Sequence, residues 1–169
     1  MTLKRPAVFK DLSIWSRFAP LALVFIAVVF GIDQAYKFWM LFVYKIAAVQ
    51  PVHVTGFFDL VLVWNTGISY GLLKSLGPWV LIISQLAICL LLWLWLAAAK
   101  DRLSAMATGL IIGGALGNIT DRILYEAVAD FFLLHGFGYS WYVFNLADVA
   151  IVAGAAILVY GSLRGSAKG

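Results

Sequence analysis

Charged residues and cysteine are scarce in this chain. Only 12% of its 169 residues are charged, whereas 64% are hydrophobic and the mean hydropathy is +0.99. A water-soluble domain needs a polar surface that this composition does not supply, so the sequence predicts an integral membrane protein. The single cysteine, Cys89, lies inside an apolar run, where it has no partner for an intrachain disulfide and no base nearby in sequence.

Metal-ligand and serine-nucleophile motifs are also missing. His53 and His135 are isolated in aromatic surroundings, where we expect a structural or interfacial role, and no HExxH motif is present, so we expect no metal site. Three serines, Ser69, Ser75 and Ser140, lack the context of a nucleophile elbow, which argues against a serine hydrolase. The excess of basic over acidic residues, 12 against 8, has a topological explanation given below and does not indicate nucleic-acid binding.

Four apolar runs are long enough to cross a membrane as helices. They cover residues 18–40, 78–99, 103–122 and 142–163. Residues 45–77 differ, because Pro and Gly interrupt short runs rich in Val, Phe and Trp, a pattern typical of two or three short strands. The sequence therefore predicts a mainly α membrane protein in which residues 1–169 form one domain, with four transmembrane helices and a small β-rich insert.

The distribution of basic residues predicts the orientation of these spans. Four spans put both termini on one side, and eight of the twelve Lys and Arg residues fall on that side. The positive-inside rule then places the termini in the cytoplasm and residues 128–148 outside. Gly109, Gly113 and Gly117 recur at every fourth position of the third span, which indicates close packing of helices.

Polar side chains within the spans gather near their outer ends. With a rise of about 1.5 Å per residue, Asp33 and Lys37 lie roughly 22 and 28 Å from the start of the first span. Asn118 and Arg122 lie roughly the same distances from the start of the third span. Asp148 lies roughly 9 Å inside the outer end of the fourth. Ionisable groups at such depths mark functional sites, so this layer predicts a site.

Asp130 and Asp148 are the best candidates for a catalytic pair. Two carboxylates held close together share a proton, so that one acts as base and the other as acid. The base would activate water for attack on an amide carbonyl, and the acid would protonate the leaving nitrogen. Spacing alone equally allows Asp130 to be a solvated loop carboxylate and Asp148 a residue favoured at a helix N-terminus.

The other polar residues of the layer have two interpretations each. Asp33 and Lys37 are four residues apart on one helix face, which favours an ion pair with the lysine reaching the interface. Three asparagines could hold a substrate's backbone or orient the aspartates, or could make ordinary turn and interhelical hydrogen bonds: Asn65, Asn118 and Asn145.

Arg122 has several candidate partners. It could fix a carbonyl or a lipid phosphate, or it could pair with Asp121 or Glu126. Two other classes of protein also remain open. One is a small proton- or ion-coupled transporter with Asp33, Asp148 and Arg122 as a relay, although charges in one layer do not make a path across the bilayer. The other is a non-catalytic assembly factor that uses the glycine face.

Five motifs in order cover most of the chain. They are Asp33-Gln34-x-x-Lys37, Asn65-Thr66-Gly67, Gly113-Gly114-Ala115-Leu116-Gly117-Asn118-x-x-Asp121-Arg122, Val128-x-Asp130-Phe131 and Phe144-Asn145-x-Ala147-Asp148. Together they resemble the lipoprotein signal peptidases of bacteria, also called signal peptidase II. The third motif is long and specific, and its combination with the last two makes coincidence improbable.

The resemblance implies an aspartic peptidase with four transmembrane helices and a small extracytoplasmic β-sheet cradle. Asp130 and Asp148 would be the catalytic pair. Four residues would line the site, namely Asn65, Asn118, Arg122 and Asn145, while Asp33 and Lys37 would support it. The implied substrate is a prolipoprotein whose cysteine carries a diacylglycerol, and the enzyme would cut just before that cysteine. No metal or organic cofactor is expected, and globomycin-type peptides are the expected inhibitors.

Further expectations concern location and shape. The resemblance places the protein in the bacterial cytoplasmic membrane, in contact with membrane lipids, and we expect a monomer. The loop from Ile123 to Trp141 is predicted to act as a lid over the site. Where the family usually has two small residues and an aromatic, this chain has Ile68-Ser69-Tyr70. That departure bears on the shape of the substrate-facing pocket and on neither aspartate.

Overall fold

Four long helices run side by side in the computed structural model, which describes residues 15–67, 77–98 and 101–166. They are α1 (Ala19–Phe38), α3 (Gly77–Ala98), α4 (Arg102–Tyr125) and α5 (Leu146–Ser166). The π-helical turn η2 (Trp39–Val43) extends α1, and the short helix α2 (Ile46–Val49) follows it. All four long helices are apolar and long enough to cross a membrane. The prediction of four spans is confirmed.

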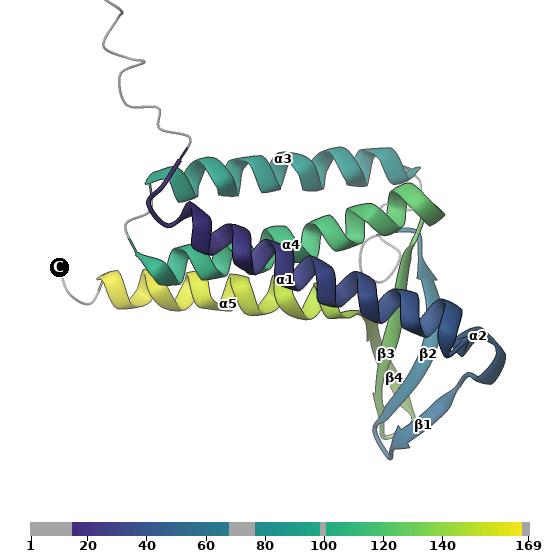
Figure 1. Cartoon of the computed structure of the whole chain (residues 1–169). Helices are drawn as coiled ribbons and strands as arrows, with labels where there is room; N and C mark the ends of the chain where they lie inside the picture. Colours follow the sequence, from purple (N-terminus) through teal and green to yellow (C-terminus); the bar gives the residue numbers. More distant parts are fainter. Residues whose placement is uncertain (1–14, 68–76, 99–100, 167–169) are drawn as a thin grey trace, which may run out of the picture.

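An antiparallel sheet lies at one end of the bundle, with its strands running across the helix axes (Figure 1). Its strands are β1 (Val52–Thr55), β2 (Phe58–Asn65), β3 (Val128–Gly136) and β4 (Tyr139–Phe144), in the spatial order β1-β2-β3-β4. The predicted β-rich insert supplies β1 and β2. The other two strands come from the stretch between α4 and α5.

The prediction of a loop from Ile123 to Trp141 is wrong. The first residues of that range finish α4, and the rest form β3, its turn and the start of β4. Phe137 and Gly138 connect the strands with φ values of 52° and 80°, the backbone conformation of a tight hairpin turn. The fourth span also begins later than predicted, because Tyr142 belongs to β4 and the helix starts at Leu146.

Small residues let α4 lie at the centre of the bundle, where it packs against the other three spans. Its Gly109 lies so close to α1 that an added Cβ would be 2.6 Å from Phe25 Cβ and 2.7 Å from the Ala22 carbonyl oxygen. Gly113 approaches the backbone of Ile26 in the same way. The prediction of close helix packing at these glycines is confirmed.

A hydrophobic cluster fixes the sheet to the outer end of α1. Met40, Ile46, Ala129 and Phe131 are fully buried in it, and Tyr36 packs against them. The cluster joins η2 and α2 to β3. Only two residues separate the end of α4 from the start of β3. This attachment brings the residues of β3 into the polar layer of the helices.

Two sets of expectations lie outside the described residues. The departure at Ile68-Ser69-Tyr70 falls in the range 68–76. Several basic residues used for the orientation also fall outside the described ranges: Lys4, Arg5, Lys10, Lys74, Lys100 and Lys168. Within the described part, α1 begins and α5 ends at the end of the bundle that is farther from the sheet (Figure 1).

Candidate active site

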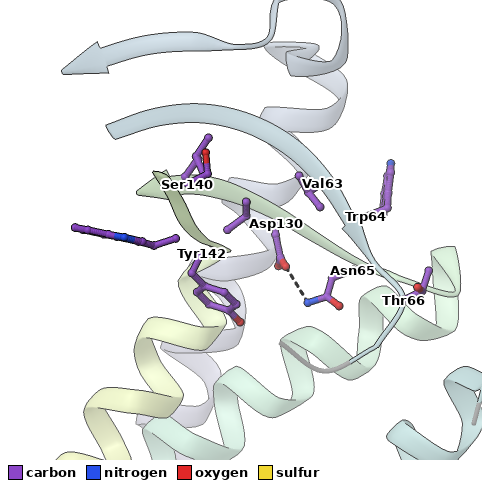
Figure 2. Close-up of a pocket in the computed structure, with 10 residues that line it drawn as sticks. Val63, Trp64, Asn65, Thr66, Asp130, Ser140 and Tyr142 are labelled. Carbon is purple, nitrogen blue, oxygen red and sulfur yellow. Dashed lines mark hydrogen bonds between the residues drawn. The ribbon is translucent and has the colours of Figure 1, made fainter. Parts of the chain in front are cut away.

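Asp130 lies near the start of β3 with only 1% of its surface exposed. Asn145 Nδ2 donates to its Oδ1 at 2.6 Å, and Asn65 Nδ2 donates to its Oδ2 at 3.1 Å. Figure 2 shows Asn65, at the end of β2, pointing toward the carboxylate. The Asn65 Oδ1 in turn accepts from the backbone N–H of Gly67, which holds the side chain in place. Both oxygens of Asp130 are therefore oriented by amides.

Asp148 occupies the first turn of α5, where a helix leaves its N–H groups without partners. The Asn145 Oδ1 accepts from the Asp148 N–H at 3.0 Å, and Asp148 Oδ2 accepts from the Asn145 N–H at 3.3 Å. This reciprocal pair is a capping box. The other oxygen, Oδ1, accepts from Asn118 Nδ2 at 2.9 Å. The carboxylate is thus held by α4 as well as by its own helix.

A continuous set of amide hydrogen bonds joins the two aspartates. Asn145 Nδ2, which contacts Asp130, also donates to Asn118 Oδ1 at 3.2 Å, and Asn118 contacts Asp148. Both carboxylates line one cavity of about 210 Å³ between α3, α4 and α5. The structure therefore brings Asp130, Asp148 and all three predicted asparagines into a single site.

The environment of Asp130 changes its protonation. Burial first, and then the negative charge of Asp148, raise the pKa of this carboxyl from its ordinary 3.8 to about 7. The hydrogen bonds from Asn145 and Asn65 oppose this rise. A carboxyl with a pKa of about 7 carries a proton about half of the time at neutral pH. Such a group can serve as an acid beside an ionised neighbour.

A buried ion triad lies behind the aspartates. Lys37 Nζ is 2.9 Å from Asp33 Oδ2 and 2.8 Å from Asp121 Oδ2, and the lysine is only 3% exposed. The predicted ion pair of Asp33 and Lys37 is present. The prediction that the lysine reaches the interface is wrong, because a second carboxylate on α4 draws the ammonium inward. Lys37 also donates to Asn118 Oδ1 at 3.3 Å, which connects the triad to the asparagines.

Arg122 takes different partners from those that its sequence neighbours suggest. Its Nη1 donates to Gln85 Oε1 at 3.0 Å and to the Asn118 carbonyl oxygen, and its Nη2 donates to the Gly67 carbonyl oxygen at 3.0 Å. The prediction that Arg122 fixes a carbonyl is correct for the carbonyl groups of Asn118 and Gly67. Pairing with Asp121 is wrong, because that residue pairs with Lys37. Arg122 therefore ties α3 and the end of β2 to α4.

A second cavity of about 250 Å³ lies on the sheet side of Asp130 (Figure 2). Strands β2, β3 and β4 line it, with Trp64, Trp141 and Tyr142 among the residues. Asn65, Asp130 and Tyr142 border both cavities. An extended chain that occupied the two cavities in turn would pass directly over the Asp130 carboxylate.

Several residues of this region escaped the sequence analysis. Gln34 joins the ion triad, Gln85 holds Arg122, and Asp121, predicted only as a partner of Arg122, pairs with Lys37. Asp121 and Gln34 lie inside the motifs quoted above, yet only the packing of α1 against α4 shows their direction. A separate cluster on the sheet places Asp59 between two imidazoles, His53 at 2.9 Å and His135 at 3.1 Å. The pairing of β1 with β2 sets His53 opposite Asp59, so the strand register is what brings this cluster together.

Metal ligands do not gather in any part of the chain that the structure describes, where no group of three His, Cys, Asp or Glu could hold an ion. The chemistry of the site is instead that of paired carboxylates with amide and guanidinium donors. Its buried charges within the spans lie in one layer at the sheet end of the described bundle: Asp33, Lys37, Asp121 and Arg122. This layer does not extend along the helices as a transporter's relay would.

Comparison with known proteins identifies the family. The sequence profile of the family described as signal peptidase (SPase) II matches residues 25–164. The chain belongs to that family. The match includes every residue of the layer described above.

Relatives and solved structures agree with this assignment. A lipoprotein signal peptidase of Nitrobacter hamburgensis is 53% identical over 137 residues, covering 77% of this chain and 84% of the relative. One from Rhodopseudomonas palustris is 48% identical over 143 residues, covering 80% and 87%. A solved structure of a bacterial membrane enzyme superposes with a TM-score of 0.78 at 25% identity, covering 88% of this chain and 91% of that one. The family and the membrane fold predicted from sequence are both confirmed.

Proposed function

We propose that this protein removes signal peptides from prolipoproteins, with Asp130 and Asp148 as the catalytic pair. The observation that supports the proposal most strongly is the amide-linked arrangement of the two carboxylates around one cavity, in a chain that belongs to the signal peptidase II family. The relatives that match most of this chain carry the corresponding name.

In the proposed reaction, the two carboxyls share one proton. The ionised one takes a proton from a water molecule, whose oxygen attacks the carbonyl carbon of the scissile peptide bond. The protonated one gives its proton to the leaving nitrogen, and the C–N bond breaks. The products are a signal peptide with a new carboxylate and a mature protein with a free amine. With its pKa raised to about 7, Asp130 is able to carry the shared proton at rest.

The three asparagines and Arg122 would hold the catalytic carboxylates and the edge of the cavity in fixed positions. Asn65 and Asn145 fix the Asp130 oxygens, and Asn118 fixes Asp148. Arg122 fixes the Gly67 carbonyl at the edge of the cavity. Oriented donors of this kind need no reorganisation when charge develops in the transition state. We infer that substitution of any of them lowers turnover more than substrate binding.

The substrate would be a precursor whose cysteine carries a thioether-linked diacylglycerol, cut just before that cysteine. Apolar residues of the helix-side cavity support this inference, since Leu81, Ile88 and Ile151 line it together with the aspartates. The exposed aromatic residues of the sheet are suited to the membrane–water interface, among them Phe137, Tyr139 and Trp141. Globomycin-type peptides would compete at the same cavities.

The basic residues support a proposed orientation. Arg17, Arg102 and Arg164 lie at the ends of α1, α4 and α5 that are farther from the sheet. We infer that this end faces the cytoplasm, that the protein lies in the bacterial inner membrane as a monomer, and that the site opens at the outer surface.

A cleavage assay with two matched precursors tests the proposed function. Purified protein in lipid vesicles receives one precursor with its diacylglyceryl group and one without, and mass spectrometry measures the products. We expect cleavage directly before the lipidated cysteine and poor or no cleavage of the other precursor. Equal turnover of both would point to a broader signal peptidase, and cleavage of neither would refute the proposal.

A further inference from the structure

The ion triad behind the site uses every donor of its lysine. The Lys37 ammonium has three N–H groups. They point to Asp33 Oδ2, Asp121 Oδ2 and Asn118 Oδ1 at 2.9, 2.8 and 3.3 Å. Gln34 reinforces the triad, because its Nε2 lies 3.1 Å from Asp33 Oδ2 and 3.2 Å from Asp121 Oδ1. A buried ion cluster is weak evidence for stability by itself, since its desolvation can cost as much as its pairing gains.

Both carboxylates of the triad also accept a hydrogen bond from the backbone. Asp33 Oδ1 accepts from the Ala147 N–H at 3.0 Å. Asp121 Oδ2 accepts from the Ala129 N–H at 3.1 Å. Ala147 directly precedes Asp148, and Ala129 directly precedes Asp130. Two carboxylates on different helices thus make the same contact, one residue before each of the proposed catalytic aspartates.

Each contact restricts the aspartate that follows it. A planar peptide leaves only two soft torsions per residue, so a fixed amide at Ala129 limits where the Asp130 Cα can lie. At α5, the Ala147 N–H is one of the groups that a helix start leaves unpaired, and a negative charge there is favoured. Asp33 supplies that charge from α1, which fixes the first turn of α5 relative to the bundle.

The surroundings leave these contacts little freedom to shift. Ala129 and Ala147 are fully buried, and Asp33 and Asp121 are each 1% exposed. Gly117 lies so close to the triad that an added Cβ would collide with Asp33 Oδ2. The Asp33 carboxylate therefore packs against the backbone of α4 at Gly117, in addition to its hydrogen bond with the Ala147 amide.

We propose that Asp33 and Asp121, joined through Lys37, are positioning residues that set the separation of the Asp130 and Asp148 carboxylates. One ammonium holds both anchors, so the two amides and the aspartates after them are fixed to a common point. This inference rests on the proposed function. Neither anchor is a catalytic residue, because each acts through a backbone amide.

This role is tested by substitutions at Asp121 and Asp33 that change either the position of the carboxylate oxygens or the charge, but not both. Asp121→Asn keeps an oxygen for the Ala129 N–H and leaves a neutral pair of Lys37 with Asp33. Asp121→Glu keeps the charge but moves the oxygens by one methylene. Misplacement of reacting groups by about 1 Å costs about 100-fold in rate. We expect the Glu variant to lose about 100-fold in kcat and the Asn variant to stay within about 10-fold of the parent. Asp33→Asn and Asp33→Glu should give the same order.

Asp101→Asn and Asp101→Glu are the matched controls. Asp101 also accepts a backbone N–H, from Ser104 at 2.8 Å, but it caps the opposite end of α4. Its variants should leave kcat unchanged. Rates are referred to the amount of folded, monodisperse protein, and KM is measured with each variant. A positioning role predicts a lower kcat with KM unchanged, whereas a purely structural role lowers the folded yield and leaves kcat per folded molecule intact.

Three results would overturn the proposal. They are an Asp121→Glu variant more active than Asp121→Asn, folded variants of both kinds with the parental kcat, and a loss confined to KM. Asp130→Asn in the same assay keeps the two claims apart. If that variant retains activity, the proposed function of the aspartates fails whatever the anchors do. If it is inactive while the anchor variants match the parent, only the positioning role fails.

Discussion

The two halves of α4 hold the bundle together by different means. In the half away from the sheet, Gly109 and Gly113 bring the backbone against α1. In the sheet-side half, where Gly117 still lies against Asp33, the side chains of Asn118, Asp121 and Arg122 bond to α5, α1 and α3. Close approach in the first half is what makes the second possible, because short side chains such as Asp and Asn can bridge helices only when their backbones are near.

The comparison suggests a division of roles along one helix. The glycine half should govern only how much protein folds, whereas the polar half should govern both the stability of the fold and the activity of the folded protein. Buried polar groups are expensive unless they are fully paired, so a loss in the polar half is expected to exceed one in the glycine half. The variants below test this order, from the largest expected effect to the smallest.

Removing Lys37, the α1 cation that pairs with the polar half of α4, should have the largest effect on stability. Lys37→Met leaves Asp33 and Asp121 buried without a counter-ion, and breaking a buried pair in this way costs about 3–5 kcal/mol. Thermal unfolding of the purified protein in detergent measures the loss. Lys45→Met, at an exposed lysine, is the control and should change little. Equal unfolding temperatures for both variants would show that the triad contributes nothing to the fold.

Asp130→Asn should stabilise the protein above neutral pH. The folded-state pKa of Asp130, about 7, lies above its ordinary 3.8, so the parent loses stability as the pH rises through this window. The neutral amide does not titrate and avoids that loss, which amounts to at most roughly 4 kcal/mol because each pKa unit corresponds to about 1.4 kcal/mol. The difference in unfolding temperature between variant and parent should therefore be larger at pH 8 than at pH 5. A difference independent of pH would contradict the raised pKa.

Overpacking the glycine half should have an intermediate effect. Gly109→Ala would force α1 away from α4, and such insertions cost about 1–3 kcal/mol. We expect a lower unfolding temperature with kcat per folded molecule near the parental value. Gly31→Ala is the matched control on α1, because an added Cβ there meets no atom within 4 Å. If Gly109→Ala removed activity without loss of stability, the division of roles along α4 would be wrong.

The smallest effect is expected on the sheet, away from both halves. Hydrogen bonds from His53 and then His135 lower the pKa of Asp59, so its ionised form stabilises the fold above the ordinary pKa. This contribution disappears as the pH falls through the lowered pKa. Asp59→Asn should therefore reduce the unfolding temperature at pH 7 by less than Gly109→Ala does, and leave cleavage unchanged. A large loss of activity would place the sheet cluster in the site.

The sequence predicted the helical part of the fold well, and the reason is physical. A span must be long and apolar to cross a membrane, so the run lengths alone located all four helices within a few residues. The hairpin of β3 and β4 was predicted as a loop, and the end of β4 was merged with the fourth span because Tyr142, Val143 and Phe144 adjoin its apolar run. The aromatic and Val residues along 128–144 and the Phe137-Gly138 turn were the signals that could have revealed it.

The site was predictable only in part. Depth along the helices indicated a polar layer, and the motifs resembling signal peptidase II indicated which residues would form it. The direction of each side chain depended on packing that no linear spacing contains. Lys37 turns toward Asp121 because α1 meets α4 there, and Asn145 reaches Asp130 because β4 pairs with β3 and leads into the start of α5. Contacts across the chain of this kind require the assembled fold.

Cleavage of a lipidated precursor by Asp130→Asn and Asp148→Asn tests the central claim most directly. Each variant is purified from the full chain, shown to be folded by its unfolding temperature, and compared with the parent at equal concentration of folded protein. We predict that both variants unfold no earlier than the parent at pH 8 and release no signal peptide. If either one, well folded, cleaves the precursor at near the parental rate, Asp130 and Asp148 are not the catalytic pair.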